Sequence, residues 1–144
     1  MSESSIFTRP DPAVERSRRV YAALAHLAAR HADTAERRAR HAHPDMPSSD
    51  EVVRLVAAMA GGIVRPGPGE PELDGTDLVA ALTLISDARA DLDNVELALL
   101  NAARARGMTW QDIAFGLGLG TAQAAQQRCD RLQARTDDAS GPTG

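Results

Sequence analysis

Apolar residues between positions 76 and 106 recur at alternating steps of three and four, and this spacing limits the fold more than any other feature. The stripe comprises Leu78, Ala81, Ile85, Ala88, Leu92, Val95, Leu99 and Ala102. Such spacing places its members on one face of an α-helix and does not fit the alternation of a strand. It predicts a long central helix. A break at Asp93 and Asn94 stays open, because both residues are good helix caps.

The composition favours the same class of fold. Only 3% of the 144 residues are aromatic while 43% are hydrophobic, so the core must be built from Leu, Val, Ile and Ala. These residues suit close-packed helices better than a sheet. The sequence therefore predicts an all-α protein with one modest core.

Breaks in the helical pattern divide the chain into four parts. We expect a flexible arm over residues 1–12, an N-terminal helical region with linkers over 13–75, a long helix with two further helices over 76–135, and a disordered tail over 136–144. Arm and tail have no apolar stripe to bury.

Three signals mark the structure expected within the N-terminal region. A helix beginning near Ala13 should bury a stripe composed of Val20, Tyr21, Leu24, Leu27 and Ala28. Ser48 and Glu51 fit a capping box for the next helix, with Val52, Val56 and Met59 as its buried face. The segment "RPGPGEPELDG" should be the most mobile internal loop.

Residues 107–134 have the pattern of two helices joined by a tight turn. Gly107 suits the left-handed end of a helix, and Thr109 with Asp112 fits a second capping box. The inner face of the first helix would be Trp110, Ile113, Ala114 and Leu117. After "GLGLG", Thr121 can cap a last helix that buries Ala125, Cys129 and Leu132 and leaves Gln123, Gln126, Gln127, Asp130 and Arg131 on its outer face.

The segment "GMTWQDIAFGLGLGTAQAAQQRCDRL" resembles the helix-turn-helix of bacterial transcription factors, in particular small actinobacterial regulators, and more distantly the promoter-binding helix-turn-helix of sigma factors. The resemblance covers residues 94–134. It implies that residues 109–117 form the positioning helix and 121–134 the recognition helix of the major groove. The sequence departs from that pattern at Ala122, where the regulators have an arginine, and at Cys129, where they have a large aromatic residue.

This resemblance implies a DNA-binding transcriptional regulator or a small nucleoid-associated protein, with double-stranded DNA as its partner. Gln123 and Gln127 are expected to bond to base edges. The other expected DNA-contacting residues are Thr109, Thr121, Gln126, Arg128, Arg131, Arg104, Arg106 and Arg135. The alternative is a protein-interaction module that uses the same scaffold, for example to dock on a sigma factor or another regulator.

The charge pattern bears on how such a protein would bind. The net charge is −4, so a single copy should hold one half-site weakly, and we expect a homo-oligomer, such as a dimer, formed through residues 78–102. The acidic residues are concentrated in the middle of the chain: residues 49–88 hold seven against two arginines, whereas residues 1–48 hold eight arginines against six acidic residues.

Other classes of function find little support in the sequence. It contains no nucleophile with a plausible base and no phosphate-cradling glycine loop, so we expect neither an enzyme nor a cofactor. His26, His31, His41 and His43 lack a further ligand at metal-binding spacing, so no metal is expected, and the run "ERRAR" is expected to be a solvated helix face. Cys129 is alone, and no apolar run suggests a signal peptide or a membrane span, which favours a cytoplasmic protein.

Overall fold

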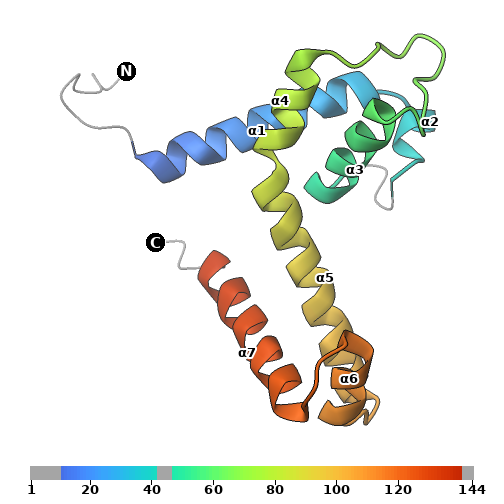
Figure 1. The fold of residues 1–144 in the computed structure, drawn as a ribbon. Helices are drawn as coiled ribbons and strands as arrows, with labels where there is room; N and C mark the ends of the chain where they lie inside the picture. The colour runs from blue at the N-terminus through green and yellow to red at the C-terminus, as the bar shows by residue number, and fades with distance from the viewer. Residues whose placement is uncertain (1–10, 42–46, 141–144) are drawn as a thin grey trace. The chain divides into compact units, whose positions relative to one another are not determined.

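The computed structural model describes residues 11–41 and 47–140, and this part of the chain is all-α, without strands. Its helices are α1 (Pro12–His31), α2 (Ala35–Arg38), α3 (Ser49–Ala60), α4 (Gly75–Thr83), α5 (Ile85–Ala105), α6 (Trp110–Leu117) and α7 (Ala122–Ala139) (Figure 1). They form two compact units, one ending at Arg89 and the other beginning at Ala90. None of these helices is long and apolar enough to cross a membrane.

In the N-terminal unit, α1, α3 and α4 pack around a common core. This core consists of Ala23, Leu27, Val52, Val56, Ala80, Ala81 and Leu84. Leu27 is buried and Val20 and Leu24 are half-buried against the core, as the spacing predicts. The prediction is wrong for Tyr21, which is 78% exposed, because α1 turns Ala23 and His31 inward and leaves the phenol ring in water.

The predicted start and buried face of α3 are confirmed. The Glu51 carboxylate accepts a hydrogen bond from the Ser48 amide at 3.1 Å, which completes the capping box at this helix end. Val52, Val56 and Met59 are buried.

The expected long helix is interrupted by one residue. α4 ends at Thr83 and α5 begins at Ile85, while Asp93 and Asn94 lie inside α5 and cap nothing. Leu84, between the two helices, has no exposed surface and packs among the core residues of α1 and α3. Because α4 belongs to this core, the expected boundary at residue 75 is wrong, and the first unit continues to Arg89.

The predicted stripe is not the buried face of α5. Leu97 and Leu100 are buried, whereas Leu92, Val95 and Leu99 are 50%, 52% and 66% exposed. α5 therefore carries two apolar stripes, and the one that contains Leu97 and Leu100 faces the core of the C-terminal unit. The exposed stripe is thus free to make contacts outside the unit.

The C-terminal unit packs α6 and α7 against the second half of α5. Its core consists of Leu97, Leu100, Ile113, Ala114, Ala125 and Leu132, with Ala103, Trp110, Leu117, Leu119 and Cys129 partly buried around it. The predicted inner faces of the last two helices are confirmed. The expected tail is wrong for residues 136–139, which continue α7 to Ala139; there the Thr136 hydroxyl donates to the Leu132 carbonyl at 3.0 Å. Residues 141–144 and 1–10 lie outside the described part of the chain.

Candidate nucleic-acid interface

Local hydrogen bonds fix both ends of the α5–α6 connection. Gly107 has φ +81°, a conformation that favours glycine, and so ends α5 as predicted. The Thr109 hydroxyl caps α6 by accepting from the Asp112 amide at 3.1 Å and donates to the Asp112 carboxylate at 2.7 Å. These bonds to Thr109 hold the pKa of Asp112 below its ordinary value. The capping box expected at this position is therefore present.

The turn between α6 and α7 is short and internally bonded. Gly118 caps α6 with φ 70°, and the Leu119 amide donates to the Ala114 carbonyl at 2.8 Å. The Leu119 side chain packs against the core, so the turn is anchored to both helices. The Thr121 hydroxyl then accepts from the Ala124 amide at 3.1 Å, which caps α7. Four residues, 118–121, thus set how α7 leaves α6.

The buried side of α7 is apolar. Ala125 has no exposed surface and Leu132 is 2% exposed, while Cys129 lies half-buried between them in sequence. Burial raises the pKa of the Cys129 thiol, and the neighbouring Asp130 carboxylate raises it further. The thiol is therefore protonated at neutral pH and fills core space.

The opposite side of α7 carries the residues expected to meet DNA. Gln123, Gln126, Gln127 and Arg131 are all exposed. Gln123 and Gln127 lie about one turn apart on nearly the same line along the helix. Asp130 is exposed on this outer side as well, so the face combines amides with charges of both signs.

The other expected contact residues are engaged within the C-terminal unit. Arg128 pairs with Glu96 of α5 at 2.5 Å, and Arg135 pairs with Asp93 at 3.0 Å. Arg104 lies over the ring of Trp110, 4.9 Å from its centroid, and donates to the Met108 carbonyl. Arg106, which precedes α6, donates to the Ala102 carbonyl.

Arg131 differs from these arginines because the described residues offer it neither an ion pair nor a hydrogen bond. Thr109 and Thr121 use their oxygens to cap helices, although the Thr121 hydroxyl keeps its proton for another acceptor. The expected DNA-contacting residues therefore fall into two sets. The other residues would have to give up contacts within the protein before they could bind DNA, whereas the unengaged group would not: Gln123, Gln126, Gln127 and Arg131.

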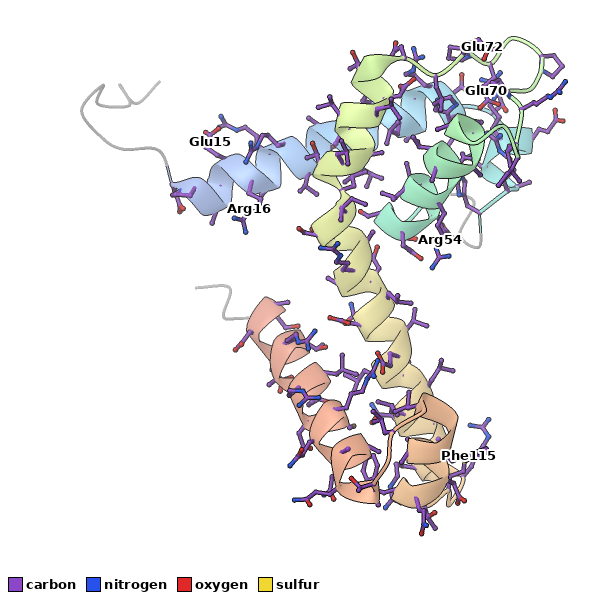
Figure 2. All side chains as sticks on the ribbon, in the orientation of Figure 1. Glu15, Arg16, Arg54, Glu70, Glu72 and Phe115 are labelled. Atoms are coloured by element: carbon purple, nitrogen blue, oxygen red, sulfur yellow. The ribbon has the colours of Figure 1, made fainter. Side chains whose placement is uncertain are left out.

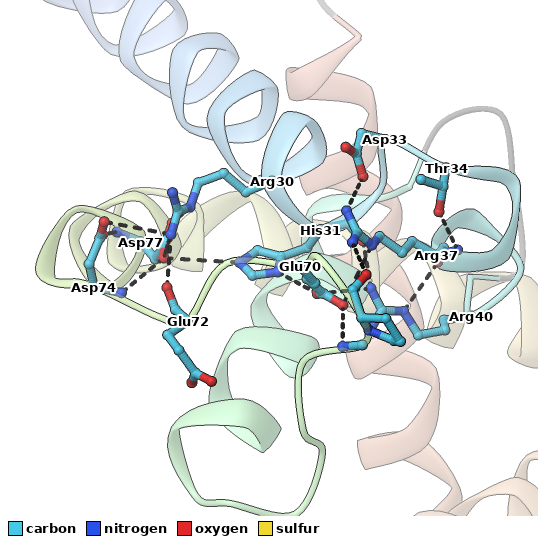
Figure 3. A network of polar contacts seen from close by, with 12 residues as sticks. Arg30, His31, Asp33, Thr34, Arg37, Arg40, Glu70, Glu72, Asp74 and Asp77 are labelled. Carbon is cyan, nitrogen blue, oxygen red and sulfur yellow. Dashed lines mark hydrogen bonds and ion pairs between the residues drawn. The ribbon is translucent and has the colours of Figure 1, made fainter.

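A second polar cluster lies in the N-terminal unit, and the sequence pattern did not predict it (Figure 3). Asp77 of α4, with no exposed side-chain surface, accepts a hydrogen bond from Arg30 Nη2 at 2.9 Å and lies 2.8 Å from His26 Nε2. Its carboxylate also accepts from the Asp74 amide at 3.0 Å. Burial alone would raise the pKa of Asp77, but these bonds outweigh it and hold the pKa below its ordinary value.

Glu70 is the other centre of this cluster and lies in the loop expected to be most mobile. Its side chain is fully buried, 2.6 Å from His31 Nδ1, and accepts from Arg40 at 3.2 Å and from the Gly67 amide at 3.0 Å. Burial would raise its pKa, but the bonds from His31, Gly67 and Arg40 lower it overall. Glu70 therefore attaches this loop to α1 through His31.

These contacts correct the interpretation of "ERRAR" as a solvated face. The side chains of Arg37 and Arg40 are only 13% and 29% exposed, since both converge on Glu70. His26, Asp74 and Asp77 place potential ligand atoms within 4.8 Å of one another, a juxtaposition that histidine spacing alone did not suggest. The Arg30 guanidinium already occupies both oxygens of Asp77, so the arrangement is built as an ion-pair cluster. His43 lies outside the described residues.

Comparison with protein-family models, with curated proteins and with solved structures gave no match to this chain. A function for this chain is therefore argued from the exposed residues of α7 described above.

Proposed function

We propose that residues 94–134 form a helix-turn-helix and that the protein is a DNA-binding regulator, or a small nucleoid-associated protein, that inserts α7 into the major groove. The observation that carries this proposal is the unengaged group of side chains on α7. The four-residue turn after α6 holds this helix in place. A major groove about 12 Å wide accepts one α-helix, and glutamine amides pair bidentately with the N6 and N7 atoms of adenine.

Within this proposal the unengaged residues have separate tasks. Gln123 and Gln127 contact base edges, and Arg131, further along α7, contacts a phosphate. Arg128 and Arg135 add phosphate contacts only by leaving Glu96 and Asp93, so their net contribution is smaller. This division assigns sequence preference to the two glutamines and general affinity to Arg131.

The charge of the C-terminal unit calls for more than one copy on the DNA. This unit holds five arginines against seven acidic residues. Since phosphate neutralisation supplies most non-specific affinity, one such unit binds weakly, and two linked copies bind two half-sites. We propose that the exposed stripe Leu92, Val95 and Leu99 joins the copies, because paired helices bury such residues.

A second function, docking on another protein, is favoured by one observation. Phe115 on α6 is 88% exposed (Figure 2), an unusual position for a large aromatic side chain unless a partner covers it. A protein partner would also tolerate the acidic balance of this unit. In this case α7 contributes packing to the scaffold rather than contacts with bases.

A selection experiment separates the two functions. Duplexes bound by the parent protein are selected from a random pool, and affinities for the preferred duplex are compared by fluorescence anisotropy for Gln127→Ala and Gln133→Ala. Gln133 is the control, because it is an exposed glutamine of α7 that lies six residues beyond Gln127, about 120° around the helix axis from it, and donates to Asp137. Loss of a bidentate contact costs about 1–3 kcal/mol, so we expect Gln127→Ala to bind about tenfold or more weakly on the preferred duplex alone. The docking function would be favoured if no duplex sequence is selected and if the parent protein binds a protein partner that Phe115→Ala no longer binds.

A further inference from the structure

A hollow of about 360 Å³ lies in the N-terminal unit between α2 and the loop that carries Glu70. Its lining consists of Thr34, Glu36, Arg37, Arg40, Val64, Arg65, Gly67, Pro68 and Glu70. Small-molecule sites have volumes of roughly 300–1,000 Å³, so this hollow can hold a compact metabolite. It is distinct from α7 and has no role in the proposed DNA contact.

The lining is dominated by three guanidinium groups. Three guanidinium groups, those of Arg37, Arg40 and Arg65, face the two lining carboxylates of Glu36 and Glu70, and Arg37 is also paired with Asp33 beside the hollow. The buried Glu70 carboxylate pairs with Arg37 and Arg40, whereas Arg65 has no carboxylate partner among the described residues. Arg65 therefore supplies a positive charge with which an anion in the hollow can pair.

Two of these guanidinium groups are held in place before any ligand arrives. Arg37 is fixed by Asp33 and by the Pro68 carbonyl, to which it donates at 3.1 Å. Arg40 donates to the His31 carbonyl at 2.6 Å and through Nε to the Arg37 carbonyl at 3.2 Å. Figure 3 shows both side chains converging beside Glu70. Because their rotamers are already restricted, little conformational entropy is lost when they bind a ligand.

These arginines retain donors that no described residue uses. A guanidinium has five N–H groups, and Arg40 Nη1 makes no hydrogen bond within residues 11–41 and 47–140. Arg65 is exposed and has neither an ion pair nor a hydrogen bond in the same part of the chain. The planar donors of arginine match the oxygens of a carboxylate or phosphate.

We propose that this hollow binds a small organic anion, with the carboxylate or phosphate group held between Arg65 and the remaining N–H donors of Arg37 and Arg40. Val64 and Pro68 contact its carbon atoms. The volume fits a metabolite rather than a polymer. The site belongs to the N-terminal unit and stands independently of the proposal for α7.

Isothermal titration calorimetry with citrate and with inorganic phosphate tests the site, with sodium chloride used to hold the ionic strength constant. The full chain is compared with Arg65→Ala and with Arg54→Ala, which removes an exposed arginine of α3 outside the hollow (Figure 2). Citrate represents carboxylates and phosphate represents phosphoryl groups. Far-UV circular dichroism checks that each variant keeps its helices, as expected because Arg65 supports no other described side chain.

We expect saturable binding of at least one of the two anions by the parent and by Arg54→Ala. The affinity of Arg65→Ala should fall about tenfold or more, because one charge-assisted contact is lost. The proposal is overturned if neither anion binds saturably, or if Arg65→Ala and Arg54→Ala bind the anion as the parent does. Equal loss in both variants also overturns it, since the effect would then be one of total charge.

Discussion

Replacing Glu70 by glutamine should destabilise the N-terminal unit strongly. Glu70→Gln keeps nearly the same shape but removes a fully buried charge that lies 2.6 Å from His31 and 3.2 Å from Arg40. Removing one partner of a buried ion pair costs about 3–5 kcal/mol. The Arg40 side chain is 29% exposed and can turn toward water, so we expect a loss near the lower limit, about 3 kcal/mol.

Glu72→Gln is a matched control for this change. Glu72 lies two residues away in the same loop, but it is exposed, and only its backbone carbonyl bonds to Arg30. Urea unfolding followed by circular dichroism should place Glu72→Gln within about 0.5 kcal/mol of the parent. For Glu70→Gln the melting temperature should fall by about 10 °C or more. Equal stability of the two variants would refute the idea that the buried network holds the loop to α1.

The same pair of variants should reveal a pH dependence of known sign. The pKa of Glu70 in the folded protein lies below the ordinary value of 4.5, so its stabilising effect is present above that pH and is lost as the pH falls through the folded value. Glu70→Gln lacks this titration. The difference in stability between parent and variant should therefore be largest near neutral pH and shrink below about pH 4.5. A difference that stays constant down to pH 3 would contradict this assignment.

Three further outcomes can be checked on single variants or on the parent. Leu92→Glu should leave the helix content unchanged but abolish self-association in sedimentation experiments, whereas an unmodified protein that is monomeric at all accessible concentrations would remove the proposed role of the stripe. Gly118→Ala should lower stability by about 1 kcal/mol in urea unfolding, because alanine is strained at φ 70° although no atom crowds the position; an unchanged midpoint would show that the turn can relax. Cys129 should react with iodoacetamide at pH 7.4 more slowly than a free cysteine, because burial raises its pKa, and an equal rate would place the thiol at the surface.

The features predicted correctly from the sequence are those with local chemical causes. The Thr109–Asp112 capping box and the left-handed Gly107 depend on residues at most three positions apart or on one backbone angle. The inner face of α7 follows from its spacing, since Ala125 and Leu132 are its only strongly apolar line. Such local signals do not depend on contacts with distant parts of the chain.

The features missed depend on contacts between distant residues. Glu70 lies 39 positions from His31 and 30 from Arg40. Only the excess of arginines before position 48 and of acidic residues after it indicated that these two regions attract each other. The break at Leu84 has no glycine or proline to mark it, because it arises from packing against α1 and α3. On α5 both apolar stripes have helical spacing, and only the position of α6 and α7 decides that Leu97 and Leu100 are buried.

The central claim, that α7 binds DNA through a phosphate contact at Arg131, is tested most directly by the salt dependence of affinity. The parent, Arg131→Ala and Arg54→Ala are titrated onto the selected duplex and onto random duplex at several salt concentrations. Arg54 is an exposed arginine of α3, so its removal changes the net charge equally. We predict that Arg131→Ala weakens binding to both duplexes and reduces the slope of log affinity against log salt by about one, while Arg54→Ala leaves that slope unchanged. Identical slopes for all three proteins, or no binding of the parent to either duplex, would contradict the claim.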